Sequence, residues 1–256
     1  MKWMQASIGW MLVGTAALLA ETAAGSGCSG SNGSGGSSSG GGSSSGSGSG
    51  GSACTSGAAL TTLPSCTSAA TASLAVPSGC APTVDGTYHQ GEWADAACIA
   101  VGSDPVYVKY SGTSLYLAWP MTPACGCGVQ LAFNADGATT LDGSQIDLSI
   151  FDDPFSATGD SSEFTSQGGT WTAAASVGSG IVIANPPNSP ALVTYEIEVP
   201  LSQLGVTPGQ AHTIGFAIVH SNAENWPAGV TTSSVSSDLP STPSNWGTFT
   251  SAANWH

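Results

Sequence analysis

The stretch LVTYEIEVPLSQLGVTPGQAHTIGFAIVHSNAENWP, from Leu192 to Pro227, decides the fold class of this chain. It begins with strict alternation, in which apolar residues from Val193 to Val199 share one face of a strand while Glu196 and Glu198 share the other. Such alternation is typical of a strand in an antiparallel sheet. It predicts one face packed in a core and one face in contact with solvent.

The second half of this stretch predicts a corner, another strand and a loop. Pro208-Gly209 is a turn signal, and the apolar segment Thr213–His220 reads as the second strand. The aromatic loop Asn222–Pro227 follows directly. We therefore expect Trp226 to be exposed at the end of a strand.

Strand signals dominate from Ala81 to the end of the chain, in short segments separated by Gly, Pro, Asn, Asp and Ser. Only Glu92–Cys98 and Leu201–Leu204 are candidates for helical turns. Many short strands without intervening helices predict an all-β fold, an immunoglobulin-like antiparallel β-sandwich over residues 81–256. The expected strands are Val106–Ser111, Ser114–Pro120, Gly128–Asn134, Gln145–Phe151, Gly169–Ala175, Gly180–Ala184, Leu192–Pro200, Thr213–His220 and Trp246–Ser251.

The beginning of the chain reads as an export signal followed by a tether. Residues 1–24 contain one lysine and an apolar run that is too short to span a bilayer, as in a signal peptide. The alternative is lipoprotein processing, which would end the leader at residue 27 and lipidate Cys28. Residues 28–52 are almost entirely glycine and serine, which predicts a disordered linker whose ends lie on average roughly 25–30 Å apart. We expect an exported protein that is either secreted or held at the cell envelope or outer surface by a lipid anchor, its only contact with a membrane.

Seven cysteines leave one over in an oxidising compartment, and Cys28 is the natural odd residue. The other six are enough for three disulfides. Residues 53–80 form a transitional segment that disulfides would fasten. Pairs Cys54–Cys66 and Cys80–Cys98 are one such arrangement, although the spacing leaves the connectivity open.

The charge balance excludes nucleic acid as a partner. Lys2 and Lys109 are the only lysines, arginine is absent, and the net charge is −14. A protein with so few cations cannot neutralise a phosphate backbone.

Three phrases of the sequence together carry a family resemblance: VDGTYHQGEWADAA from Val84 to Ala97, EIEVPLSQLG from Glu196 to Gly205, and PSNWG from Pro243 to Gly247. In this order they resemble the family 9 carbohydrate-binding modules and their DOMON-like relatives, over about Ala81 to His256. The resemblance implies a DOMON-like β-sandwich that binds sugars. It also implies that the tryptophans of the EW and WG phrases pack inside the domain.

Sugar binding on a β-sandwich needs aromatic rings that stack on the sugar, with polar groups beside them for its hydroxyls. Trp226 is the candidate stacking residue, and Trp119 is the candidate second face of a clamp such as the family has. Asn222, Glu224 and Asn225 would supply polar contacts. The basic side chains that help the family to bind sugar hydroxyls are missing here.

Two metal-containing alternatives also follow from the sequence and the resemblance. Asp147, Asp152 and Asp153 belong to an acidic region that suits structural calcium, which family members commonly hold. Some DOMON-like domains bind haem instead, and Met121 and His220 would then be the axial ligands.

The resulting prediction is a monomer that binds a polysaccharide or oligosaccharide without turnover. Glu196 and Glu198 point the same way from one strand, whereas a glycosidase needs two carboxylates that face each other. The histidines show no catalytic-triad order or zinc spacing. A haem-binding electron-transfer domain and a structural surface protein without a ligand are the alternatives.

Overall fold

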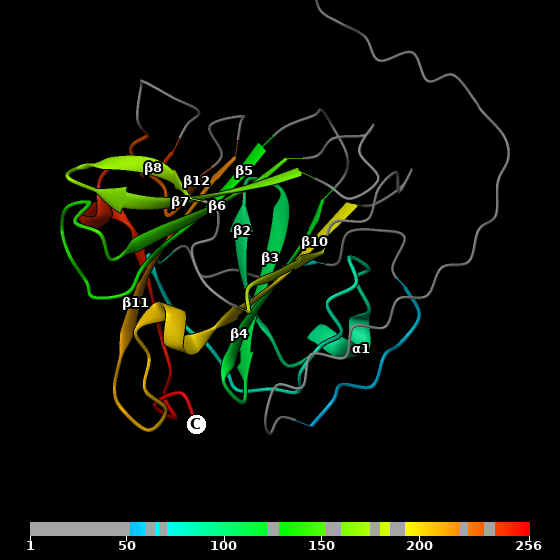
Figure 1. Ribbon diagram of the computed structural model, residues 1–256. Helices are drawn as coiled ribbons and strands as arrows, with labels where there is room; N and C mark the ends of the chain where they lie inside the picture. Colours follow the sequence, from blue (N-terminus) through cyan, green and yellow to red (C-terminus); the bar gives the residue numbers. More distant parts are fainter. Residues whose placement is uncertain are drawn as a thin grey trace, which may run out of the picture. The chain divides into compact units, whose positions relative to one another are not determined.

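The computed structural model describes residues 52–59, 65–66, 71–121, 128–151, 160–174, 180–184, 193–220, 225–232 and 239–256. These residues form two β-sheets packed face to face around a common core (Figure 1). The predicted all-β sandwich is therefore confirmed. The predicted leader, Cys28 and all of the predicted tether except Ser52 lie outside the described residues.

The larger sheet holds the strands that form the candidate site. Its strands follow one another in the order β1, β13, β11, β5, β6, β7 and β8, and β12 pairs with β11. Neighbours are antiparallel, except that β1 runs parallel to β13. The bounds are β1 Ser73–Ala75, β13 Gly247–Thr250, β11 Thr213–His220, β12 Asn225–Trp226, β5 Gly128–Asn134, β6 Gln145–Phe151, β7 Asp160–Gln167 and β8 Thr170–Ala174.

The smaller sheet is antiparallel throughout, in the order β2, β3, β4, β10 and β9. Its bounds are β2 Ala97–Val101, β3 Asp104–Ser111, β4 Ser114–Met121, β10 Val193–Pro200 and β9 Val182–Ala184. One short α-helix, α1 Gln90–Trp93, and two 3₁₀ turns, η1 Leu201–Leu204 and η2 Pro243–Asn245, complete the described elements.

The core between the sheets follows the two-residue period of the strands. Alternate residues of β4 and β10 point inward, and so do alternate residues of β5 and β11 from the other sheet. Inward-facing members include Leu117, Ile197, Leu131 and Phe216, each at most 1% exposed. Because both sheets contribute fully buried side chains, neither sheet would be stable without the other.

The outer face of the smaller sheet is covered, which corrects one prediction. Glu196 and Glu198 do share a strand face, but Glu196 is fully buried and Glu198 is half-buried. The segment that contains Tyr88 and Trp93 packs over this face, together with Tyr107 and Tyr116 of the sheet. The predicted solvated face is wrong because the chain folds back over it.

Four strands were not predicted, β1, β2, β7 and β12, and two of them have local explanations. Ala97–Val101, which overlaps the expected helical turn Glu92–Cys98, is strand β2 and pairs with β3. Strand β7 was not predicted, since its inward positions include the polar residues Glu163 and Thr165, opposite Leu148 and Ile146 of β6. A strand at that margin of the sheet does not need apolar alternation.

The two disulfides join the cysteines differently from the pairs suggested by the sequence. The disulfides are Cys54–Cys80 and Cys66–Cys98, with Cα–Cα distances of 4.9 and 6.0 Å. Ala53 forms a parallel bridge with Ala81, and this bridge places Cys54 beside Cys80. Cys125 and Cys127 lie outside the described residues. Disulfides are typical of an oxidising, extracellular-type environment.

A search of the described residues for a helix long and apolar enough to cross a membrane finds none.

Candidate functional site

A polar groove of about 610 Å³ lies on the outer face of the larger sheet. Its floor comes from two neighbouring strands, where Thr213 of β11 stands opposite Thr250 of β13, and Gly215 stands opposite Thr248. These positions alternate with core residues such as Ile214 and so must face outward. The volume falls within the range of about 300–1,000 Å³ that is typical of small-molecule sites.

Gly215 sets the depth of this groove. A Cβ atom at Gly215 would come within 2.8 Å of the Asn134 Cβ on the neighbouring strand β5. Such an approach is too close for two carbon atoms, so a side chain here would push Asn134 aside. The glycine therefore allows Asn134 to form part of the groove.

Asn134 is held rigidly by a buried polar network. Its Nδ2 donates to the Ala138 carbonyl at 2.8 Å, and its Oδ1 accepts from Gln145 Nε2 at 3.1 Å. Ser166 Oγ in turn donates to Gln145 Oε1 at 2.5 Å. All three side chains of this network are at most 4% exposed. Satisfied buried networks of this kind fix side-chain positions, so one wall of the groove is preorganised.

The other polar groups of the groove are more accessible. Thr213 and Asp136 are exposed, while Thr248 and Thr250 are half-buried. Asp136 Oδ1 accepts from Ala138 N at 3.0 Å and from Ser144 Oγ at 2.7 Å. The groove thus offers hydroxyl groups and one carboxylate at fixed positions.

The end of the chain closes the groove with an unusual backbone conformation. Asn254 lines the groove with φ 52°, and Trp255 follows with φ 61°. Left-handed conformations are uncommon for residues other than glycine, and for a bulky residue they store strain. The Trp255 indole is fully buried and donates to the His212 carbonyl at 3.0 Å, while Gly209 N donates to the Asn254 carbonyl at 2.8 Å. These contacts hold the strained turn in place.

One tryptophan lines the other side of the groove. Trp246 follows η2, lines the groove and is 6% exposed. Its ring is parallel to that of Trp171 with the centroids 6.4 Å apart, and Trp171 Nε1 donates to the Pro240 carbonyl at 2.7 Å. Trp171 is half-buried and is not among the residues that line the groove, so the aromatic contact there is limited to the small exposed part of Trp246.

Trp226 does not have the predicted exposed position. It is 5% exposed and packs against Phe216 and Phe249, with both centroid separations 5.9 Å. A Cβ atom at Gly247 would lie 2.5 Å from the Trp226 ring, which explains why glycine follows Trp246. The expectation of an exposed stacking ring at Trp226 is wrong because Asn225–Trp226 pairs with β11 and the ring packs into the core.

Of the remaining predicted ligand-binding residues, Trp119 and Asn225 do not line the groove. Trp119 is 1% exposed and lies in the core, so the predicted clamp has no second open face. Asn225 is half-buried, and its Nδ2 donates to the Val230 carbonyl at 3.4 Å. Asn222 and Glu224 lie outside the described residues.

The predicted calcium ligands are only partly visible. Asp147 is fully buried on the outer face of the larger sheet, opposite Ala132 and Phe164, and neither carboxyl oxygen has a hydrogen-bond partner. Burial raises the pKa of Asp147 well above its usual value. Asp152 and Asp153 lie outside the described residues, and no metal-binding group of three or more acidic, histidine or cysteine residues occurs within them. Calcium at Asp147, Asp152 and Asp153 stays a prediction.

The haem alternative gains no support from its predicted ligands. The His220 ring is buried and lies against the Trp119 ring of the opposite sheet, with the centroids 5.8 Å apart. The side chain of Met121 lies outside the description. Because Trp119 already occupies the space beside His220, a haem ring there would have to displace it.

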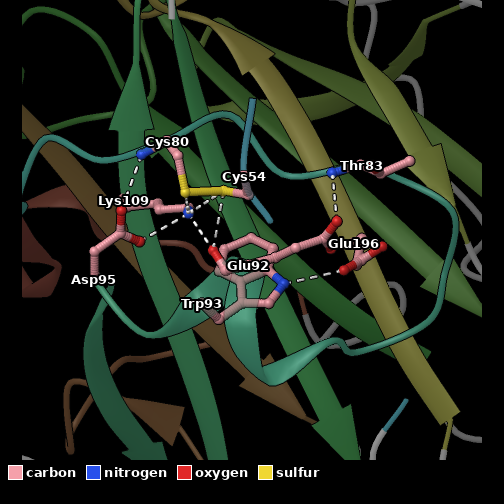
Figure 2. Close-up of polar contacts among 8 residues, drawn as sticks. All are labelled: Cys54, Cys80, Thr83, Glu92, Trp93, Asp95, Lys109 and Glu196. Atoms are coloured by element: carbon pink, nitrogen blue, oxygen red, sulfur yellow. Dashed lines mark hydrogen bonds and ion pairs between the residues drawn. A yellow bond between two sulfur atoms is a disulfide. The ribbon is translucent and has the colours of Figure 1, made fainter. Parts of the chain in front are cut away.

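A second polar cluster lies on the outer face of the smaller sheet and connects two of the three phrases of the family resemblance (Figure 2). Glu196 Oε2 accepts from the backbone N–H groups of Asp85 and Gly86, both at 2.9 Å, and Oε1 accepts from Trp93 Nε1 at 3.1 Å. Glu196 of the EIEVPLSQLG phrase thus accepts hydrogen bonds from both Asp85-Gly86 and Trp93 of the VDGTYHQGEWADAA phrase. Burial raises the pKa of Glu196 to about 7, although these donors act in the opposite direction.

Lys109 lies in the same cluster and is fully buried. Its Nζ forms an ion pair with Asp95 Oδ1 at 2.8 Å, donates to the Glu92 carbonyl and lies 5.2 Å from the centre of the Trp93 ring. Burial lowers the pKa of Lys109, and Asp95 opposes this shift. The one lysine or arginine of the described residues is therefore on the opposite sheet from the groove.

The residues of the groove were missed at the sequence level, although a signal exists. Thr248 and Thr250 alternate around Phe249, and Thr213 and Gly215 alternate around Ile214. Once the apolar residue is assigned to the core, its small polar neighbours must share the outer face. What the sequence could not show is that β11 and β13 are adjacent and in register.

Comparison with known proteins adds no identification, because no family model, curated protein or solved structure matches this chain.

Proposed function

We propose that this protein binds neutral glycans noncovalently in the groove over β11 and β13. The single observation that carries the proposal is the composition of the groove, which has threonine hydroxyls on its floor, a preorganised side at Asn134 and the exposed part of Trp246 beside them. Sugars present hydroxyls around apolar ring faces, and sites that bind them combine convergent polar groups with aromatic surface.

The charge of the protein supports neutral glycans over anionic ones. The groove is lined by one carboxylate, Asp136, and by no lysine or arginine. The whole chain carries a net charge of −14. A uronate or sulfated sugar would approach a surface of its own sign and find no cation to pair with, which lowers both the association rate and the affinity.

The groove also favours binding over hydrolysis. Glycosidases use two carboxyl groups, at separations of about 5–10 Å, across the scissile bond. Asp136 is the only carboxyl side chain that lines the described groove. Among the described residues, a sugar held there would meet no second carboxyl group.

Titration calorimetry with the full chain tests the proposal, using neutral gluco-, xylo- and manno-oligosaccharides and an oligogalacturonate as the anionic arm. The informative variant is Thr248→Val, which keeps the side-chain shape and removes one hydroxyl from the floor. Losing one hydrogen bond costs about 0.5–1.5 kcal/mol, so the affinity should fall about 2- to 10-fold. Thr172→Val is the matched control, because Thr172 is an exposed strand threonine outside the groove.

The outcomes separate the parts of the proposal. Binding of a neutral sugar that Thr248→Val weakens and Thr172→Val leaves unchanged would support both the function and the site. Equal binding by both variants would leave glycan binding in place and contradict the site. If the folded protein bound none of the neutral sugars, the function would be wrong.

A further inference from the structure

The disulfide Cys54–Cys80 has a cation beside it, which is unusual in a chain with so few cations. Lys109 Nζ lies 3.2 Å from Cys54 Sγ and 3.5 Å from Cys80 Sγ (Figure 2). The lysine reaches this position from β3 of the smaller sheet, with its whole side chain buried. Glycan binding on the opposite sheet does not use this arrangement.

The contacts of Lys109 hold its ammonium group beside the two sulfur atoms. The ammonium is held on one side by Asp95 Oδ1 and the Glu92 carbonyl, and on the other it faces the two sulfurs. Asp95 is itself anchored, because its Oδ2 accepts from Cys80 N at 2.9 Å. A change at Asp95 therefore alters the electrostatic field at the disulfide directly.

Disulfide sulfurs are weak acceptors, so Lys109 gains little from them while the bond is intact. A thiolate at the same position would form a close ion pair with the ammonium. Nearby cations lower the pKa of a thiol, and a thiol of lower pKa departs faster in exchange. Lys109 thus stabilises the reduced form and the leaving thiolate more than it stabilises the disulfide.

We propose that Cys54–Cys80 is a redox-active disulfide that small thiols reduce, with Cys54 as the leaving thiolate beside Lys109. A thiolate of the reductant attacks Cys80 Sγ, the Cys54–Cys80 bond breaks, and its electron pair goes to Cys54. A second molecule of the thiol attacks the reductant's sulfur in the mixed disulfide and releases Cys80 as a thiol. Two thiols are oxidised to one disulfide, and the protein gains two electrons and one proton, which Cys80 takes up, while the second proton goes to solvent and Cys54 remains the thiolate beside Lys109.

The position of this disulfide in the chain gives its reduction a consequence. It lies where the described chain first contacts the sandwich, next to the hydrogen bonds that join Ser52 and Cys54 to Ala81. Both cysteines are half-buried, so solvent reaches part of each. Beyond the disulfide and these bonds, residues 52–59 are held by Ser56 Oγ on Glu92, by the His89 ring on the Gly57 carbonyl and by a backbone bridge between Ala59 and His89. Reduction would loosen the attachment of residues 52–59 to the domain.

The chain contains its own control, because Cys66–Cys98 has no lysine or arginine against it among the described residues. The full-length protein is equilibrated in glutathione redox buffers, free thiols are alkylated, and each pair is assigned by mass spectrometry. The digest needs pepsin, since Lys2 and Lys109 are the only cleavage sites for trypsin. We expect the equilibrium constant for reduction of Cys54–Cys80 to be at least about tenfold larger than that for Cys66–Cys98. This corresponds to a difference in reduction potential of about 30 mV.

Two variants assign the effect to Lys109. Lys109→Met removes the charge and should shift the equilibrium of Cys54–Cys80 about tenfold toward the disulfide. Lys109→Arg keeps the charge and should leave Cys54–Cys80 easier to reduce than Cys66–Cys98. If neither variant folds, the comparison of the two disulfides in the wild type still decides. The proposal is overturned if Cys54–Cys80 of the wild type is no easier to reduce than Cys66–Cys98, or if folded Lys109→Met is reduced as readily as the wild type.

Discussion

Replacing Glu196 with glutamine should remove a loss of stability that the wild-type protein suffers as the pH rises. Glu196 is fully buried, and its pKa in the folded protein is about 7, against 4.5 for a glutamate in solution. The folded state therefore binds the proton more tightly than the unfolded state does. Between these two values the folded carboxyl must ionise in a buried position, so the unfolding free energy falls as the pH rises.

The size of this effect follows from the difference between the two pKa values. A difference of about 2.5 units at about 1.36 kcal/mol per unit gives a loss of about 3 kcal/mol from this group between pH 4.5 and pH 7. Glutamine resembles the protonated acid in shape and does not titrate. The difference in unfolding free energy between Glu196→Gln and wild type should thus move in favour of the variant across this window.

Urea unfolding at half-unit steps from pH 4 to pH 8, followed by tryptophan fluorescence, measures that difference. Subtracting the variant from the wild type cancels the contributions of the other carboxyl groups. A difference that is flat with pH would refute the reasoning. A difference that moves in favour of the wild type would mean that the three N–H donors outweigh burial and that the carboxylate is ionised throughout.

Three further predictions concern packing and burial. Gly247→Ala should lower the unfolding free energy by about 1–3 kcal/mol, because the added methyl group meets the Trp226 ring. The control Gly57→Ala adds a methyl group that makes ordinary contacts only, and it should cost less than about 1 kcal/mol. Equal urea midpoints for the two variants would contradict this packing. Trp119→Ala should cost about 3–5 kcal/mol as a core truncation, and a loss below 1 kcal/mol would place the ring outside the core. Asp147→Asn should have the same unfolding free energy as the wild type near pH 4 and become more stable than the wild type as the pH rises. The reason is that burial raises the pKa of Asp147, whereas the asparagine does not titrate. A difference in unfolding free energy that stays constant with pH would show that Asp147 does not titrate in this range.

Strand alternation was a reliable guide wherever a strand has one buried face. Gln145–Phe151 and Thr213–His220 are strands with the predicted bounds, because each alternates apolar residues into the core. The same rule missed β7, whose inward positions are polar. It also assigned Glu196 to solvent, because alternation distinguishes two faces of a strand but does not show what covers the second face.

The candidate site was harder to predict than the fold because it depends on contacts between distant segments. Trp226 looked exposed because polar residues surround it in sequence, yet the core accepts its ring where Gly247 leaves space. The groove needs Thr248 and Gly215 side by side, and these residues are far apart along the chain. No local pattern encodes that register.

The most direct test of glycan binding in the groove is a titration of the ¹⁵N-labelled protein with the neutral oligosaccharide panel, followed by amide chemical shifts. We predict saturable shifts concentrated on the outer face of the larger sheet, at Thr213, Gly215, Thr248 and Asn254. The amides of Asn225 and Trp226 should move little. Shifts centred on Asn225 and Trp226, or no shifts with any neutral sugar, would contradict this account.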